Sequence, residues 1–152
     1  MSTRGIKLLE QKGAAFEVVE YVYKRKGAGR AADAGGWDEA QVGKSLVVTA
    51  GRDFWFVLVP ADRDLSLKKL ARLLGVKAVE MASVRDAERL TGYVEGGISP
   101  FGSYAALPVV MEQGLLEHDR VLINAGHRGV LVALSPWDLQ DLLGAEVEDV
   151  VT

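Results

Sequence analysis

Apolar residues recur along this chain in two patterns, and each pattern predicts a different kind of element. Seven short runs are apolar throughout or alternate with polar residues, and they are rich in Val and other β-formers, which is typical of strands. They cover residues 16–23, 46–50, 54–60, 76–80, 107–111, 120–126 and 130–134. The three-residue connections at 51–53 and 127–129 predict that two pairs of these strands form hairpins.

Four segments carry apolar residues at helical spacing between start and stop signals. The first covers residues 4–12 and stops at Gly13. The other three begin after serines, which favour helix N-caps, and two of them stop at glycines. We therefore expect helices from Ser66 to Gly75, from Ser83 to Thr91 and from Ser135 to Gly144.

The order of these elements predicts the fold class. Helices and hairpins are intermixed without a regular βαβ alternation, so an α+β or mixed α/β fold is expected, with a curved, largely antiparallel or mixed, barrel-like sheet flanked by helices. No internal repeat or linker divides the chain, and its 152 residues fit one domain, 1–152.

Composition narrows the chemistry. With 49% hydrophobic and 26% charged residues the chain is globular. The absence of cysteine excludes disulfides, thiolate metal sites and a cysteine nucleophile. His118 and His127 lack the helical spacing of a zinc pair, so we expect no metal and no cofactor. Charges interrupt the N-terminus before a signal-like stretch forms, and no run reaches the length of a membrane span, which indicates a cytoplasmic protein.

A basic cluster stands out against the formal net charge of −3. Its four members are candidate contacts to phosphate groups, because neutralising phosphate depends on charge more than on sequence position. They are Lys24, Arg25, Lys26 and Arg30, within a Gly-, Ala- and Arg-rich stretch, 24–36, that predicts a loop or a short helix. A solvated basic loop is the alternative interpretation.

The string TGYVEGGISPFGSY, residues 91–104, is the densest glycine segment. Its Gly97–Gly102 spacing matches a phosphate loop, but the lysine that would follow is missing and Pro100 removes a backbone donor, so a nucleotide triphosphatase is not expected. Glycines let a ligand carbonyl reach the main chain and accept hydrogen bonds from N–H groups at Gly97, Ile98 or their neighbours. A turn that only connects two elements is the alternative.

Two other features have a functional and a plain interpretation. The letters of residues 27–32 match a dinucleotide fingerprint, but Gly35 and Gly36 interrupt the helix that this motif requires, so a nicotinamide site is not expected. Lys44, in QVGKSLVV, is either a solvated lysine at a strand end or a cation that stabilises developing negative charge beside the glycine segment.

Four segments together resemble the YbaK/ProX family of aminoacyl-tRNA editing domains. They are QVGKSLVV, GVKAVEMASVRDAERL, TGYVEGGISPFG and NAGHRGV, and the resemblance runs in the same order over nearly the whole chain. It implies a hydrolase that cleaves the ester of a mischarged tRNA, with alanyl- or cysteinyl-tRNA for proline as first candidates. A free-standing protein is expected, with mischarged tRNA as its partner and prolyl-tRNA synthetase as a second candidate partner.

The resemblance also implies roles for individual residues. Lys44, Gly96, Gly97 and Ile98 are the candidate catalytic groups, because in the family the glycine loop polarises the substrate carbonyl and the strand lysine contacts the substrate. The implied substrate contacts are Tyr21, Ser99, Pro100, Gly102, Asn124 and Gly126.

Several positions depart from the family pattern. Val22 and Tyr23 stand where acidic and histidine residues often follow the tyrosine, and Leu131 stands where cysteinyl-tRNA deacylases carry an aspartate. Residues 103–106, which include no lysine, stand where the cysteinyl-tRNA deacylases tend to carry lysines. These changes leave open a non-catalytic module that binds tRNA or a synthetase; Lys44 and the uninterrupted loop favour an enzyme.

Overall fold

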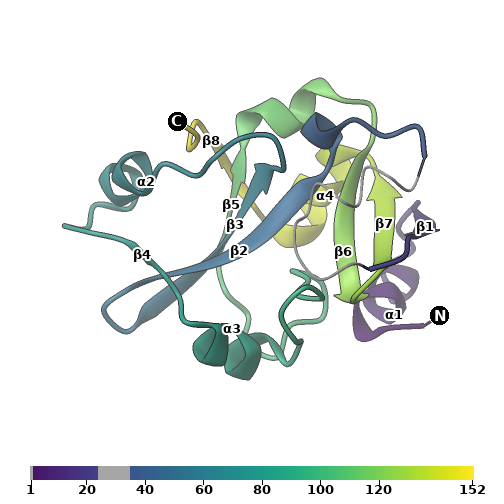
Figure 1. Ribbon diagram of the computed structural model, residues 1–152, viewed down its shortest axis with the longest axis horizontal. Coiled ribbons are helices and arrows are strands. Elements are labelled where there is room, and N and C mark those ends of the chain that lie inside the picture. Colours follow the sequence, from purple (N-terminus) through teal and green to yellow (C-terminus); the bar gives the residue numbers. More distant parts are fainter. Residues whose placement is uncertain (1, 24–34) are drawn as a thin grey trace.

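The computed structural model describes residues 2–23 and 35–152, and this part of the chain forms two sheets with helices around them (Figure 1). The smaller sheet has three antiparallel strands in the order β1-β7-β6. Their bounds are Glu17–Glu20 for β1, Val130–Leu134 for β7 and Val121–His127 for β6. The predicted hairpin at 127–129 is confirmed as the β6–β7 connection, and the run 16–23 forms a shorter strand than expected.

The larger sheet has five strands in the order β4-β2-β3-β5-β8. The predicted hairpin at 51–53 joins β2 to β3, whereas β3–β5 and β5–β8 are parallel pairs. The bounds are Gly43–Ala50 for β2, Asp53–Pro60 for β3, Glu80–Met81 for β4, Val109–Glu112 for β5 and Glu146–Glu148 for β8. The run 76–80 therefore contributes only its last residue to a strand.

The two sheets meet at one point and then separate. Val42, just before β2, forms a parallel bridge with Leu122 of β6, and the two strands diverge beyond it (Figure 1). Further along, Val48 and Thr49 of β2 pair with β4 instead. The mixed α+β class is thus confirmed, but the expected barrel does not close within the described residues, because the free edge of β2 passes from β6 to β4.

The helices follow their sequence signals. Ser66, Ser83 and Ser135 each accept a hydrogen bond from a backbone N–H in the first turn. Left-handed glycines end the same three helices. The bounds are Arg4–Gln11 for α1, Leu67–Leu74 for α2, Val84–Thr91 for α3 and Pro136–Leu143 for α4; short 3-10 helices at Glu39–Gln41 (η2) and Gln113–Glu117 (η3) were not predicted.

Strand β3 lies at the centre of the core because both of its faces are buried. Phe56 and Leu58 pack into one apolar cluster with β5, β6, β7 and α4, and Val57 and Val59 pack into another with α2. This accounts for the nearly continuous apolar run of β3 in place of an alternating one. Within the described residues, no helix is both long enough and apolar enough to cross a membrane.

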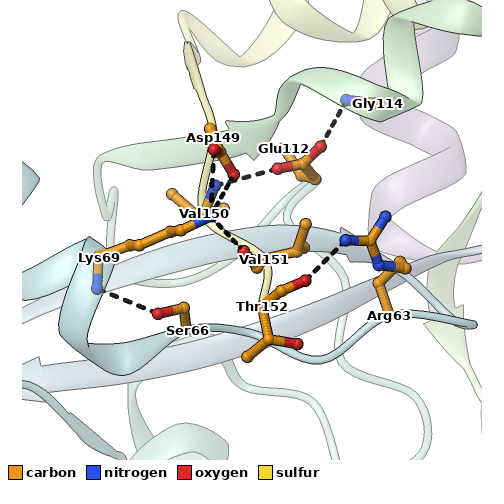
Figure 2. A network of polar contacts seen from close by, with 9 residues as sticks. All are labelled: Arg63, Ser66, Lys69, Glu112, Gly114, Asp149, Val150, Val151 and Thr152. Carbon is orange, nitrogen blue, oxygen red and sulfur yellow. Dashed lines mark hydrogen bonds and ion pairs between the residues drawn. The ribbon is translucent and has the colours of Figure 1, made fainter.

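A network of polar contacts fastens the C-terminal residues to α2 and β5 (Figure 2). The carboxylate of Glu112, which is 5% exposed, accepts hydrogen bonds from the N–H groups of Gly114 at 2.6 Å and Val150 at 3.0 Å. Lys69 pairs with Asp149 and donates to the Val151 carbonyl at 2.7 Å. None of these groups lines the cavity described below, so the network stabilises the fold and not the site.

Candidate active site

A cavity of about 670 Å³ lies where β2 and β6 diverge, beside α3 and the glycine segment that follows it. Most of its wall is apolar, with a few polar side chains among them. The lining residues are Tyr21, Tyr23, Val42, Gly43, Lys44, Ser45, Leu46, Val47, Met81, Ala82, Val84, Ala87, Glu95, Gly96, Ile98, Asn124 and Leu131. A concave, mostly apolar wall with few polar groups is typical of a small-molecule site.

The structure brings Lys44 and the glycine segment to the same cavity. Lys44 lies near the start of β2, while Gly96 and Ile98 belong to the segment after α3, and all three line the wall. The Lys44 ammonium donates to the backbone carbonyl of Arg63 at 2.7 Å. Because an ammonium carries three donors and this contact uses one, two further N–H groups of Lys44 are left for a ligand.

The glycine segment is held from two sides at its cavity end. The Glu95 N–H donates to the Glu88 carboxylate at 2.8 Å, which ties the segment to α3. From the β6–β7 hairpin, Arg128 donates through Nε to the Glu95 carbonyl at 2.7 Å and Asn124 donates through Nδ2 to the Gly96 carbonyl at 3.0 Å. Both carbonyls thus point to fixed partners, so the orientation of the intervening peptides is set in advance.

Close approach of the hairpin accounts for the glycine at position 97. A Cβ there would lie 3.0 Å from the Arg128 nitrogen and 3.1 Å from the His127 carbonyl carbon, both in the backbone. The Gly97 N–H donates to the Val94 carbonyl at 2.8 Å, so it is not the open donor that the sequence suggested. The N–H groups of Gly96 and Ile98, in contrast, donate to no acceptor among the described residues.

Four predicted substrate contacts lie outside the cavity wall and shape the loop instead. Ser99 is fully buried and its hydroxyl accepts from the Phe101 N–H at 3.1 Å, while Pro100 is also buried. Gly102 and Gly126 pack against neighbouring side chains and backbone, which leaves no room for a Cβ. The sequence indicated these positions through the resemblance alone, which does not separate wall from support.

Arg4 of α1 supports the same loop, although no sequence motif indicated this role. Its guanidinium lies between two tyrosine rings, 4.3 Å from the centroid of Tyr93 and 4.2 Å from that of Tyr104. It also donates to the Thr91 carbonyl at 2.9 Å and to the Gly102 carbonyl at 3.0 Å. Planar stacking together with two directed hydrogen bonds requires an arginine and not a lysine.

Two tyrosines that follow β1, Tyr21 and Tyr23, also line the cavity. Burial raises the pKa of the Tyr21 hydroxyl, the neighbouring Tyr23 raises it further, and a backbone hydrogen bond to Gly129 opposes the shift. Tyr21 therefore remains a neutral hydroxyl at physiological pH. The Tyr23 ring lies against the Cα of Gly96, where a Cβ would come within 2.5 Å of its hydroxyl, and Arg128 covers the ring at 5.2 Å.

Comparison with known protein families decides the assignment. Residues 24–142 match the model of the aminoacyl-tRNA editing domain. The chain belongs to this family. The match includes the strand of Lys44, the glycine segment and the β6–β7 hairpin, each of which contributes to the cavity wall.

Individual relatives are similar to this chain over most of their own length. The chain is 28% identical to EbsC of Enterococcus faecalis, named for Cys-tRNA(Pro)/Cys-tRNA(Cys) deacylation, over 99% of this chain and 93% of that protein. It is 31% identical to the Escherichia coli multifunctional Ser/Thr-tRNA deacylase ProXp-y, over 89% and 83%. A crystal structure described as a trans-editing enzyme for prolyl tRNA synthetase superposes with a TM-score of 0.91 at 30% identity, covering 100% and 99%.

The positions that depart from the family pattern lie in different surroundings in this editing domain. Tyr23 and Leu131 line the cavity, and Leu131 is 4% exposed, so the wall is apolar there. Val22 is exposed, as is Tyr104, whose ring stacks on Arg4. The basic residues Lys24, Arg25, Lys26 and Arg30 lie outside the described residues, and their assignment to tRNA phosphates stays a prediction.

The structure also shows a polar group that the sequence analysis missed. Ser45, next to Lys44 on β2, lines the cavity, and its hydroxyl oxygen is buried without a hydrogen-bond partner among the described residues. Within residues 2–23 and 35–152, no group of three or more His, Asp or Glu side chains is arranged to hold a metal ion.

Proposed function

We propose that this chain is an aminoacyl-tRNA deacylase, which hydrolyses the ester between a wrongly attached amino acid and the 3′ end of a tRNA. The observation that carries the proposal is the meeting of Lys44, Gly96 and Ile98 in the wall of one cavity. A cation and backbone N–H donors aimed at a carbonyl stabilise the negative charge that develops when water attacks an ester.

In this mechanism the substrate carbonyl oxygen accepts hydrogen bonds from the unengaged N–H groups of Gly96 and Ile98. Water adds to the carbonyl carbon, and the charge on the oxygen of the tetrahedral intermediate is stabilised by those donors and the Lys44 ammonium. The C–O bond to the ribose then breaks, and the water proton passes to the ribose oxygen through the adjacent ribose hydroxyl. The products are a free amino acid and a tRNA with a free 3′ end.

The described residues that line the cavity include no histidine, and Glu95 is their one carboxylate. His127 lies outside the wall, with Nδ1 2.8 Å from the Arg128 carbonyl oxygen. General base catalysis by protein side chains therefore contributes little to the rate of hydrolysis, and polarisation of the substrate carbonyl contributes most. Removing a single donor of this kind costs about 3 kcal/mol in other hydrolases, which is adequate for an activated ester and insufficient for an amide.

The cavity wall beside Leu131 favours an amino acid with an uncharged side chain, and the first candidates are alanine and cysteine attached to the tRNA for proline. Leu131 and its apolar neighbours provide no charged partner for a side chain. The relatives named for deacylation of cysteinyl- and seryl- or threonyl-tRNA extend the panel to be tested. The partner is mischarged tRNA, with prolyl-tRNA synthetase as a second candidate, and the place of action is the cytoplasm, where charged tRNA is consumed.

The proposal is tested by release of labelled amino acid from alanyl-, cysteinyl-, seryl- and threonyl-tRNA, with the tRNA for proline in the first three. The native protein is compared with Lys44→Ala and with Lys68→Ala, which removes an exposed lysine of α2 outside the cavity. Selective release that Lys44→Ala loses and Lys68→Ala keeps supports a deacylase. Binding of these tRNAs without release from any of them would show a binding module instead.

A further inference from the structure

One stretch of β2 lines the cavity, and no neighbouring strand among the described residues pairs with it on that edge. The Val42 carbonyl accepts from the Ala61 N–H at 2.7 Å, so this carbonyl points toward the β3 side. Along an antiparallel strand, the backbone N–H and C=O groups of successive residues point alternately toward one neighbouring strand and toward the opposite edge. Ser45 therefore presents its N–H and carbonyl to the opposite edge, as does Val47, whose carbonyl accepts from the Ala82 N–H at 3.0 Å.

On this opposite edge, within the described residues, β2 bridges to β6 at Val42 and meets β4 and the residue after it from Val47 to Thr49. Ser45 lies between the two contacts and lines the cavity. An unpaired strand edge binds polar groups readily because its donors and acceptors are already aligned. In most folds such an edge faces solvent, whereas here it faces the cavity.

The side chain of Ser45 has the same unfulfilled capacity. Its Oγ is buried and has no hydrogen-bond partner among the described residues. A hydroxyl is both a donor and an acceptor, and leaving it unpaired in an apolar wall costs free energy. A polar group that enters the cavity can supply this partner.

We infer that Ser45 is a specificity-determining residue, and that its hydroxyl hydrogen-bonds the side-chain hydroxyl or thiol of the aminoacyl group. This inference rests on the proposed deacylase function and narrows its substrate class to seryl and cysteinyl esters in preference to alanyl esters. A site built around a hydrogen bond rejects the analogue that lacks the group, since its own polar atom is then left unpaired. An all-apolar wall would discriminate these side chains only weakly.

Two variants of matched shape isolate the hydroxyl. Ser45→Thr keeps it, whereas Ser45→Val replaces it with a methyl group in a side chain of nearly the same outline. Both are measured for kcat/KM on seryl-, cysteinyl- and alanyl-tRNA for proline, with circular dichroism to confirm the fold. Relative to Ser45→Thr, we expect Ser45→Val to lower the ratio of kcat/KM for the seryl or cysteinyl ester to kcat/KM for the alanyl ester by about tenfold, which corresponds to about 1.4 kcal/mol.

The outcomes separate this inference from the function on which it rests. A native protein that hydrolyses alanyl ester faster than both others would overturn the specificity role while confirming a deacylase. An equal loss on all three esters would also overturn it, because Ser45 would then contact a part that all substrates share. No hydrolysis of any ester by the native protein would refute the proposed function itself.

Discussion

Arg4 donates from Nε to the carbonyl oxygen of Gly102 at a distance of 3.0 Å, across 98 positions of sequence. Its Nη2 donates to the Thr91 carbonyl at 2.9 Å, so one guanidinium holds both ends of the glycine segment. The N-terminal helix thus positions the loop that lines the cavity, although none of its residues lies in the wall. This contact links the stability of α1 to the geometry of the site.

Replacement of Arg4 by Met should lower deacylation by about tenfold and the free energy of unfolding by about 1–3 kcal/mol. The Gly102 carbonyl would lose the Arg4 donor, the Thr91 carbonyl would keep only its bond from the Tyr104 N–H, and two tyrosine rings would lose their stacking group. Arg4→Lys should rescue little, since an ammonium lacks the planar fork. The comparison variant is Arg72→Met, an exposed arginine of α2. Activity is measured where each variant is fully folded; unchanged kcat in Arg4→Met would contradict a positioning role.

Gly97→Ala should destabilise the protein through packing and not through backbone strain. The new Cβ would lie 3.0–3.2 Å from three backbone atoms of the β6–β7 turn, which cannot move aside as a side chain would. We expect a loss of about 1–3 kcal/mol in denaturant unfolding, together with reduced activity. Gly13→Ala provides the contrast, because its Cβ meets nothing within 4 Å and only its positive φ is unfavourable. Equal activity in the two variants would show that the turn does not set the cavity.

Glu112→Gln tests the network at the C-terminus. The carboxylate accepts two backbone N–H bonds in a nearly fully buried position, and charged acceptors are stronger than neutral ones. The substitution should cost about 1–3 kcal/mol of unfolding free energy and speed hydrogen exchange at Val150, with kcat/KM for deacylation unchanged. Slow exchange retained at Val150 would mean that β8 is held by its strand pairing alone.

Alkaline pH should lower stability through two tyrosines. Burial raises the pKa of Tyr21 and of Tyr93, although Arg4 opposes the shift at Tyr93. Between pH 10, the ordinary pKa, and the raised value, the unfolded chain binds fewer protons than the folded one, so the free energy of unfolding falls as pH rises. The contribution is fully present below pH 10. Absorbance titration near 295 nm should show late ionisation in the native protein, and Tyr21→Phe should reduce the late fraction.

The local parts of the fold were predictable because their signals are local. Serine caps and left-handed glycines set the ends of three helices, and both hairpins carry short connections between apolar runs. Sheet order was not predictable, because β5 enters between β3 and β8 through parallel pairs that leave no mark in the spacing. A continuous apolar run such as β3 indicates burial of both faces but not which strands lie beside it.

The site divides in the same way. The resemblance placed Lys44, Gly96 and Ile98, and the structure brings them to one cavity. It also suggested Ser99 and Gly102 as substrate contacts, whereas they support the loop from behind. Arg4 and Ser45 carried no signal: the first acts across 98 residues, and the second matters because β2 lacks a neighbour at that position.

The assignment of the cavity as the site of hydrolysis is tested most directly by the rate of ester cleavage in a single turnover. The protein is in excess over its substrate, which is the tRNA ester that the native protein cleaves best. The Lys44→Ala variant should bind this tRNA nearly as well as the native protein but cleave it about a hundredfold more slowly at saturation, because it lacks a cation at the developing oxyanion. Lys68→Ala should match the native rate. Cleavage by Lys44→Ala at the native rate would contradict the assignment of the cavity as the site of hydrolysis.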